Sequence, residues 1–392
     1  MMERWRYIYL PEMYFKAMWI FALFLYILIP LKSSAVSLAY QGIVFITFGC
    51  FILLFVKKMD KSKIFVGNKE MICAILLVIT VIVSFLLGSE AITFDIQIIG
   101  ILGFIEMPIA IMLMDCVDYS EQNKKFILYI NILIAVVFSI LSITKYAYSG
   151  ILDSLYLGYS NPNATAIYIL INQAILIMFL PMIKKINIKV LVIALCLYEE
   201  YLIYLTDSRT CLIISMAIVI YYFFGKNFKI KKCMILVAMI FPLVFLLVYT
   251  NMYAAGKYAD LRILGKELYS GREVYFLSQK HLISWKNILG DVRRYHFTNM
   301  HNGSLAIIAS CGLLGYICWF SFYFLTIQRY YRNAKTQLQH IALVAILGVF
   351  FHSCSEAALI VGGAHYSIIV ATFFWILKGS PYGSEVDRTE YK

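Results

Sequence analysis

The chain has 392 residues, of which 62% are hydrophobic and only 14% are charged. So little charge excludes an ordinary soluble domain, in which about a quarter of the residues are charged. The formal net charge of +12 would point to nucleic acid in a soluble protein, but here most basic residues lie in short segments between apolar stretches. The composition therefore favours a membrane protein and argues against a nucleic-acid partner.

Twelve apolar stretches follow one another along the chain, most of them close to the roughly 20 residues that a helix needs to cross a bilayer. Lipid offers backbone groups no hydrogen-bond partners, so spanning stretches of this kind are helical. The predicted fold is an all-α polytopic membrane protein with about 12 transmembrane helices. The predicted spans are 14–31, 37–56, 71–89, 92–114, 126–148, 164–183, 188–205, 208–225, 233–250, 303–327, 338–354 and 358–377.

Every second connection between these spans is basic. The chain has 34 lysines and arginines. On one side of the predicted membrane, the chain ends and short connections carry 23 of them, whereas the short connections on the other side carry only Lys32, Lys145 and Arg209. The positive-inside rule then places both termini in the cytoplasm of a cell (plasma or inner) membrane. One long connection, 251–302, is then predicted to face outward, and it carries the remaining eight lysines and arginines. The predicted organisation is 1–250 with nine spans, 251–302 as an extracytoplasmic catalytic loop, 303–377 with three spans, and 378–392 as a cytoplasmic tail.

Three predicted helices begin on the outer side with distinctive polar sequences. They open at Asn161-Pro162-Asn163, at Thr206-Asp207-Ser208-Arg209 and at Met300-His301-Asn302-Gly303. Helix N-termini carry partial positive charge and free N–H groups, which suit an anion. If the three starts converge, they form an outward-facing anion pocket beneath the long loop.

Arg209 is the first candidate to bind a ligand. A cation in the first turn of a helix opposes the helix dipole, so capping does not explain it, whereas an anion shared with the helix end does. The simpler alternative is an interfacial arginine that reaches water or pairs with Asp207 or Glu200. Glu200, near the outer end of the preceding span, is also a candidate to orient Arg209.

The long loop contributes Arg272 within the sequence Ser270-Gly271-Arg272-Glu273. A guanidinium is a planar fork that matches phosphate oxygens. Arg293 and Arg294 belong to a wider basic field in the same loop, which would attract a phosphate-bearing lipid. The alternative is that these are solvated loop arginines, with Arg272 paired to Glu273 or Glu267.

His301 stands where the loop returns to the membrane. Histidine exchanges a proton near neutral pH, and Asn302 beside it is placed to orient the imidazole or a sugar hydroxyl. Many interfacial histidines do neither. Five carboxylates also lie in or near predicted spans, where ionisable groups are usually functional or paired. These are Asp95, Glu106, Glu199, Glu200 and Glu356.

Several sequence signatures are missing. The chain has no DxD pair, HExxH, Walker A loop or GxSxG elbow, and its nine cysteines lie mainly in predicted spans without a CxxC motif. The few acidic residues of the long loop are scattered, whereas a divalent cation needs clustered oxygen ligands. We therefore expect metal-independent chemistry without a cofactor.

The motifs together resemble the O-antigen ligase and Wzy-type polysaccharide polymerase superfamily. His301-Asn302 followed by Gly312-Leu313-Leu314-Gly315 is similar to its His-Asn and Gly-x-x-Gly signature. Ser208-Arg209, Gly271-Arg272 and Asn161-Pro162-Asn163 resemble its motifs at earlier helix starts and in the loop. The resemblance covers roughly 159–315, and the first 150 residues match only in hydropathy.

The resemblance implies a GT-C-like membrane glycosyltransferase that polymerises undecaprenyl-diphosphate-linked oligosaccharide repeat units for capsule, O-antigen or exopolysaccharide. Arg209 and Arg272 would bind the diphosphate and His301 would accept the proton of the attacking hydroxyl. Asn161, Asn163, Ser208, Arg293, Arg294, Asn302 and Glu200 would line the substrate site. A chain-length regulator is a partner that the sequence leaves open.

Two other functions remain open. A ligase would use the same chemistry to pass the glycan to a lipid or protein acceptor, because the shared motifs do not encode the acceptor. A flippase or other transporter of lipid-linked oligosaccharide also suits twelve helices. Transporters often have two related halves, whereas this chain has one long loop in the second half and none in the first.

Overall fold

The structure is a computed structural model of the full chain. It describes 2–379 apart from 34, 57–66, 91–93, 150–154, 160–161, 226–228, 258–261, 264–265, 268–271, 296–299 and 358–363.

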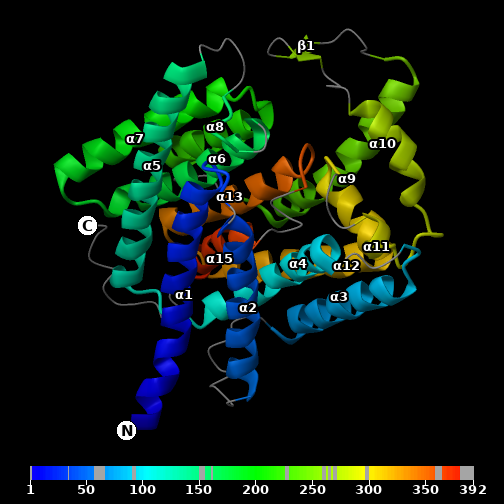
Figure 1. The fold of residues 1–392 in the computed structure, drawn as a ribbon, viewed down its shortest axis with the longest axis horizontal. Coiled ribbons are helices and arrows are strands. Elements are labelled where there is room, and N and C mark those ends of the chain that lie inside the picture. The colour runs from blue at the N-terminus through cyan, green and yellow to red at the C-terminus, as the bar shows by residue number, and fades with distance from the viewer. Residues whose placement is uncertain are drawn as a thin grey trace.

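The described chain is almost entirely helical, as the sequence predicts (Figure 1). Each of the twelve predicted spans overlaps one helix. These helices are α1 (Met2–Leu28), α2 (Ala35–Val56), α3 (Asn68–Leu87), α4 (Phe94–Asp115), α5 (Glu121–Ser149), α6 (Pro162–Phe179), α7 (Ile186–Leu205), α8 (Arg209–Phe224), α9 (Lys232–Ala254), α12 (Gly303–Arg332), α13 (Gln337–His352) and α15 (Ala364–Lys378). A 3-10 turn, η2 (Leu180–Met182), follows α6.

The helices have the character of membrane spans. Among the described residues, seven are long and apolar enough to cross a bilayer, namely α1, α2, α3, α5, α6, α9 and α12. α8, α13 and 366–378 of α15 are shorter apolar helices. Large apolar side chains such as Phe45, Leu86, Leu197 and Phe224 are more than two-thirds exposed. Exposed apolar surface on this scale indicates contact with lipid, so the chain is a helical membrane-embedded protein.

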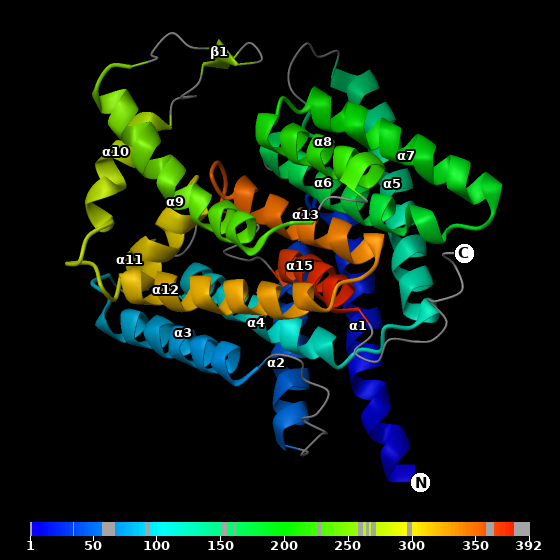
Figure 2. The same ribbon diagram turned by 180° about the vertical axis from the view of Figure 1, so that it is seen from behind.

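The helices cross one another rather than forming one parallel bundle (Figures 1 and 2). α3, α4 and α12 lie together, while α1 and α2 run across their direction. α5, α6, α7 and α8 form a second group. α13 contacts α8, α9 and α15, and α15 contacts α4, so these two helices join the groups.

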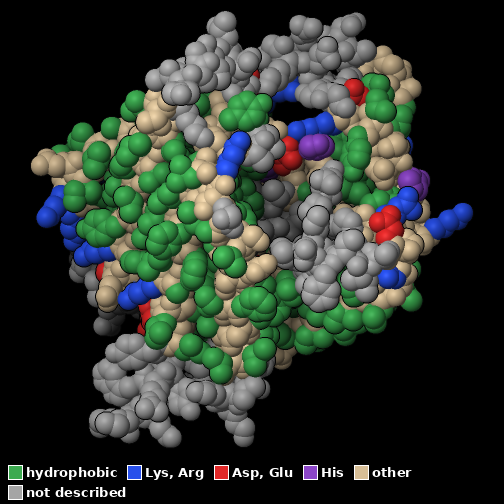
Figure 3. All heavy atoms as spheres, viewed as in Figure 1, with side chains coloured by type: hydrophobic (Ala, Val, Ile, Leu, Met, Phe, Trp, Pro, Cys, Tyr) green, Lys and Arg blue, Asp and Glu red, His purple; other side chains and the backbone are tan. Residues whose placement is uncertain are grey.

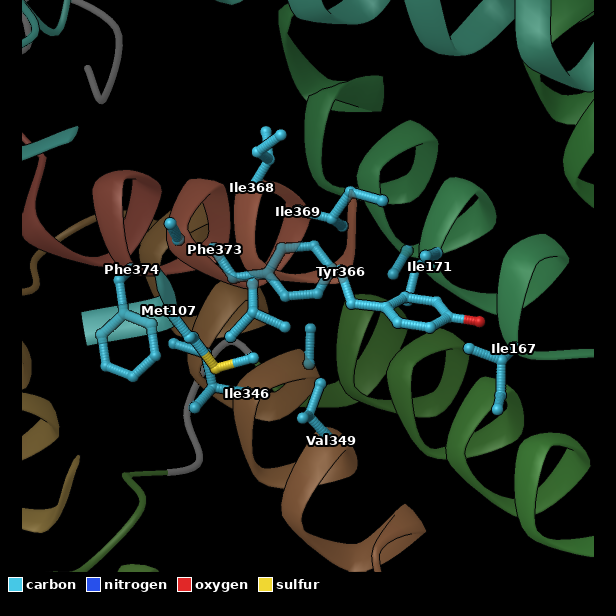
Figure 4. Close-up of a cluster of buried hydrophobic side chains, with 14 of the residues drawn as sticks. Met107, Ile167, Ile171, Ile346, Val349, Tyr366, Ile368, Ile369, Phe373 and Phe374 are labelled. Carbon is cyan, nitrogen blue, oxygen red and sulfur yellow. The ribbon is translucent and has the colours of Figure 1, made fainter. Parts of the chain in front are cut away.

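An apolar core fills the junction between the groups. Met107 of α4, Ile171 of α6, Val349 of α13 and Phe373 of α15 meet there (Figure 4), and Phe373 is almost fully buried. Close packing of this kind fixes how the ends of α6 and α13 lie relative to each other. The site described next includes the first turn of α6 and the residues that follow α13.

The connection between α9 and α12 has little regular structure. It contains one antiparallel pair of two-residue strands, β1 (Arg262–Ile263) and β2 (Lys266–Glu267), with Arg262 opposite Glu267. Three short helical segments follow: α10 (Glu273–Gln279), η4 (Lys280–Leu282) and α11 (Val292–Tyr295). The sequence between 261 and 285 is compatible with a helix, but the described part is helical only over 273–282.

Backbone hydrogen bonds join this connection to α12 at a point where the helix is interrupted. At Gly312 the helix has φ 71° and ψ −177°, a conformation open essentially to glycine alone. The N–H groups of Leu313 and Leu314 donate to the carbonyls of Asn287 and Ile288 at 3.0 and 3.1 Å. Asp291 N–H donates to Ala309 O at 2.9 Å. Apolar surroundings demand such partners for freed backbone groups, so the break in α12 fixes the end of the loop.

Candidate functional site

Glu356 is the centre of a polar cluster. Its Oε1 accepts hydrogen bonds from Arg272 Nη2 at 2.8 Å and from Asn163 Nδ2 at 3.0 Å. Its Oε2 lies 3.3 Å from His301 Nδ1. Arg272, Asn163 and His301 thus meet at one carboxylate although they lie far apart in the sequence.

Four separate segments supply these side chains. Arg272 directly precedes α10, Asn163 lies in the first turn of α6, and His301 stands two residues before α12. Glu356 follows the end of α13 by four residues. The cluster therefore links the long connection to the starts of two helices and the end of a third.

A second layer of contacts holds the cluster in place. Arg272 Nη1 donates to Ser355 O at 2.5 Å. The Ser355 hydroxyl lies 3.0 Å from the hydroxyl of Thr210 in the first turn of α8. The N–H groups of Ser355 and Glu356 both donate to His352 O, at 3.0 and 3.2 Å, and so form a turn that ends α13. His352 itself is fully buried.

The cluster is accessible from one side. The side chains of Glu356 and Arg272 are 16% and 23% exposed, while that of His301 is 45% exposed. Figure 3 shows basic, acidic and histidine side chains gathered at a hollow in an otherwise largely apolar face. A guanidinium and an imidazole beside water-accessible space can meet a polar ligand that arrives from that side.

Glu356 is ionised at neutral pH. Burial opposes its ionisation, but the hydrogen bond with His301 and the charge of Arg272 outweigh burial and hold the pKa of Glu356 below its ordinary value. An ionised carboxylate only accepts hydrogen bonds. The cluster therefore contains one fixed negative charge, one fixed positive charge and one group that can take up a proton.

An aromatic side chain covers part of the imidazole. The rings of Tyr275 in α10 and His301 lie 6.4 Å apart, edge to face at 75°. Burial raises the pKa of Tyr275, so its hydroxyl stays neutral. Tyr275 comes from the same short helix that Arg272 precedes, so α10 sets the surroundings of both Arg272 and His301.

The N-terminus of α8 lies beside the cluster. Ser208 occupies the position before the helix and is buried, and Arg209 opens the helix with a partly buried side chain. The next residue, Thr210, makes the contact to Ser355 described above. This places the backbone of Arg209 one residue from the second layer around Glu356.

Asn302 has a structural role that sequence reasoning missed. Its Oδ1 accepts the N–H of Leu305 at 3.0 Å and so caps α12. Its Nδ2 donates to Pro242 O and Cys354 O at 3.2 and 3.3 Å. The residue is fully buried. Asn302 thus fastens the start of α12 to α9 and to the turn that carries Glu356.

Three other predicted residues lie in different surroundings. Glu200 accepts hydrogen bonds from Gln173 Nε2 at 2.7 Å and from the Ser215 hydroxyl, between α6, α7 and α8. Arg293 donates to Leu86 O at the end of α3, at 3.5 Å. The Arg294 guanidinium lies over the ring of Tyr295. Asn161 lies outside the described residues.

Glu356, Ser355 and Thr210 were not among the predicted site residues. The sequence points to Glu356 only as one of five carboxylates in or near predicted spans. A usable signal existed, because Glu356 falls in the short gap between the predicted spans 338–354 and 358–377. The predicted topology puts that gap on the same side as His301, so a carboxylate there was a natural partner for it.

Within the described part of the chain, no three histidine, cysteine or acidic side chains gather in a way that could hold a metal ion. No family model, curated protein or solved structure matches this chain. The site is therefore defined by its own geometry: a guanidinium, an amide and an imidazole held around one partly buried carboxylate.

Proposed function

We propose that the protein polymerises lipid-diphosphate-linked oligosaccharide repeat units. The observation that carries the proposal is the convergence of Arg272 and His301 on Glu356. A guanidinium next to an imidazole at the edge of a membrane protein suits a reaction with an anionic leaving group and a hydroxyl nucleophile. Transfer of a glycan from undecaprenyl diphosphate is such a reaction.

In this reaction the hydroxyl oxygen of an incoming repeat unit attacks the anomeric carbon of the growing glycan. The bond from that carbon to the diphosphate oxygen breaks, and undecaprenyl diphosphate leaves with the bonding electrons. The proton of the hydroxyl passes to Nε2 of His301. Negative charge grows on the leaving oxygen, and fixed cations nearby lower the barrier by stabilising it.

Arg272 is assigned to the diphosphate. Its contacts to Ser355 and Glu356 use Nη1 and Nη2, whereas a guanidinium carries five N–H donors. It can therefore keep both partners and still donate to phosphate oxygens. Arg209, at the start of α8, is assigned as the second cation, and Asn163 as a polar contact for the sugar or phosphate.

His301 is assigned as the proton acceptor. Nearly half of its side chain is exposed, and its Nδ1 is the nitrogen that faces Glu356. Nε2 is then the nitrogen available to the attacking hydroxyl. General bases of this kind typically contribute 10²–10⁴-fold to a rate.

The proposed reaction requires a particular orientation of the chain in the membrane. Both termini lie in the cytoplasm, all twelve apolar helices are embedded in a cell membrane, and the connection between α9 and α12 faces outward in a GT-C-like arrangement. The support is the alternation of basic and non-basic connections. The reacting groups then stand on the side where lipid-linked repeats are joined without a nucleotide, since the departing diphosphate supplies the driving force.

The proposal is tested by replacing Arg272 in a cell that depends on this protein for its polymer. Arg272→Ala should abolish polymer and cause single lipid-linked repeats to accumulate, as measured by gel electrophoresis of the glycan and mass spectrometry of the lipid fraction. Arg272→Lys keeps the charge but loses the fork, so we expect it to restore only part of the activity.

Arg332→Ala is the matched control, because Arg332 is an exposed arginine at the far end of α12. It should leave polymer length unchanged. Normal polymer in Arg272→Ala cells with wild-type protein levels would remove Arg272 from the reaction.

A further inference from the structure

The carboxylate of Glu356 makes two separate sets of contacts. One oxygen, Oε1, accepts hydrogen bonds from both Arg272 and Asn163. The other, Oε2, faces His301 Nδ1. Both Arg272 and the Asn163 amide nitrogen are obligatory donors in these contacts, so Oε1 has to remain an acceptor.

The carboxylate also determines which nitrogen of the His301 imidazole carries the proton. Because Glu356 is an ionised acceptor, the nitrogen that faces it must carry hydrogen. His301 then has Nδ1–H directed at Glu356 and a free electron pair on Nε2. This is the tautomer that can accept a proton from a hydroxyl on the exposed side of the ring.

We propose that Glu356 is a positioning residue that holds His301 in its base-competent tautomer and Arg272 in its diphosphate-binding orientation through a single carboxylate. This inference rests on the proposed transfer reaction. Glu356 does not itself contact substrate.

The shared carboxylate also explains how the proton is held during transfer. When Nε2 takes the hydroxyl proton, His301 becomes a cation 3.3 Å from the negative charge of Glu356. That charge stabilises the imidazolium. The proton remains on His301, because the second contact with Arg272 keeps Glu356 a weak base.

Glu356→Gln separates this role from a merely structural one. The glutamine has nearly the same shape, but one oxygen becomes NH₂. That NH₂ cannot face Arg272 and Asn163, which are both donors, so it must face His301. It then donates to Nδ1 and forces the hydrogen onto Nε2, the opposite tautomer.

The first measurement reads the tautomer directly. Wild-type and Glu356→Gln proteins labelled with ¹⁵N-histidine are compared by solid-state NMR in lipid at pH 9. The His301 signal is assigned among six histidines by its loss in His301→Ala. We expect a protonated Nδ1 in the wild type and an unprotonated Nδ1 in Glu356→Gln. An unprotonated Nδ1 in the wild type, or the same tautomer in both proteins, would overturn the proposal.

The second measurement is turnover of a synthetic lipid-linked repeat unit. We expect Glu356→Gln to lower kcat roughly 100-fold, within the range of a misplaced general base, while its melting temperature stays close to that of the wild type. Glu121→Gln is the control, because Glu121 is an exposed carboxylate at the start of α5 that pairs with Lys124, away from the Glu356 cluster. It should keep the wild-type kcat.

The two measurements distinguish two failures. An unchanged kcat in Glu356→Gln refutes the positioning role even if the wild type polymerises the substrate. A wild type that does not turn over the substrate refutes the transfer reaction, and the NMR result then decides whether Glu356 still controls the imidazole.

Discussion

Replacing Gly312 tests whether the break in α12 anchors the long connection. A Cβ at this position would lie 2.2 Å from the carbonyl oxygen of Ile288, 2.3 Å from its carbon and 2.5 Å from the nitrogen of Leu289. All three are backbone atoms, so no side-chain rotation relieves the clash. Gly312→Ala therefore forces the connection away from α12.

The size of the effect follows from these contacts. The connection must retreat by about 1 Å to reach ordinary van der Waals distance, which disrupts the bonds from Leu313 and Leu314 to Asn287 and Ile288. Each lost bond costs about 1 kcal/mol, and more if a buried partner stays unpaired. The backbone conformation adds about 1–3 kcal/mol for a residue with Cβ. We expect a total loss of roughly 3–6 kcal/mol.

A thiol-reactive dye measures this loss in purified protein. The buried cysteines, Cys311 beside Gly312 among them, react when the protein opens, above a constant signal from the exposed Cys233. Gly312→Ala should lower the melting temperature by roughly 4–7 °C. Gly256→Ala is a matched control, because Gly256 has φ +67° and none of the described residues lies within 4 Å of its Cβ position. Only the conformational cost of about 1–2 kcal/mol is then expected. Equal melting temperatures for the two variants would refute the anchoring role.

Three further predictions concern the residues around the site. His301→Ala should cut turnover while leaving binding of the lipid-linked donor intact; full activity would remove the histidine from the mechanism. Asn302→Ala should lower stability by about 2 kcal/mol, because α12 loses its cap and two carbonyls lose a donor; an unchanged melting temperature would contradict this.

In the same group, Asp291→Asn should destabilise the protein at neutral pH, because hydrogen bonds from Ser89 and Arg294 outweigh burial and lower the pKa of Asp291 below 3.8. Since the folded-state pKa is lowered, the stabilisation is complete above 3.8 and is lost as pH falls through the lower folded value. The melting temperatures of variant and wild type should therefore converge at low pH; a constant difference would contradict the assignment.

The sequence was most informative where one physical rule dominates. Hydrophobic runs long enough to span lipid predicted all of the long helices, because a bilayer allows little else. Residue type and position in the sequence point to Arg272, Asn163 and His301, and the structure brings these three side chains to a single carboxylate. The number of helices that cross the membrane and the topology stay predictions.

Other features depend on contacts that a linear sequence does not display. The predicted topology puts Glu356 on the same side as His301, but its contacts with Arg272 and Asn163 depend on how α6, α10 and α13 pack. Gly312 belonged to a predicted motif, yet its role at the break in α12 depends on the backbone of the long connection. Asn302 looked like a ligand to sugar or imidazole, whereas its described contacts are a helix cap and two backbone carbonyls.

The most direct test of the central claim uses purified protein in lipid with one synthetic undecaprenyl-diphosphate-linked repeat unit and EDTA. We predict a ladder of products that differ by one repeat, with release of undecaprenyl diphosphate, and no ladder from Arg272→Ala. Unextended substrate in the wild-type reaction, or a ladder of equal length from Arg272→Ala, would contradict a guanidinium-assisted glycan transfer at this site.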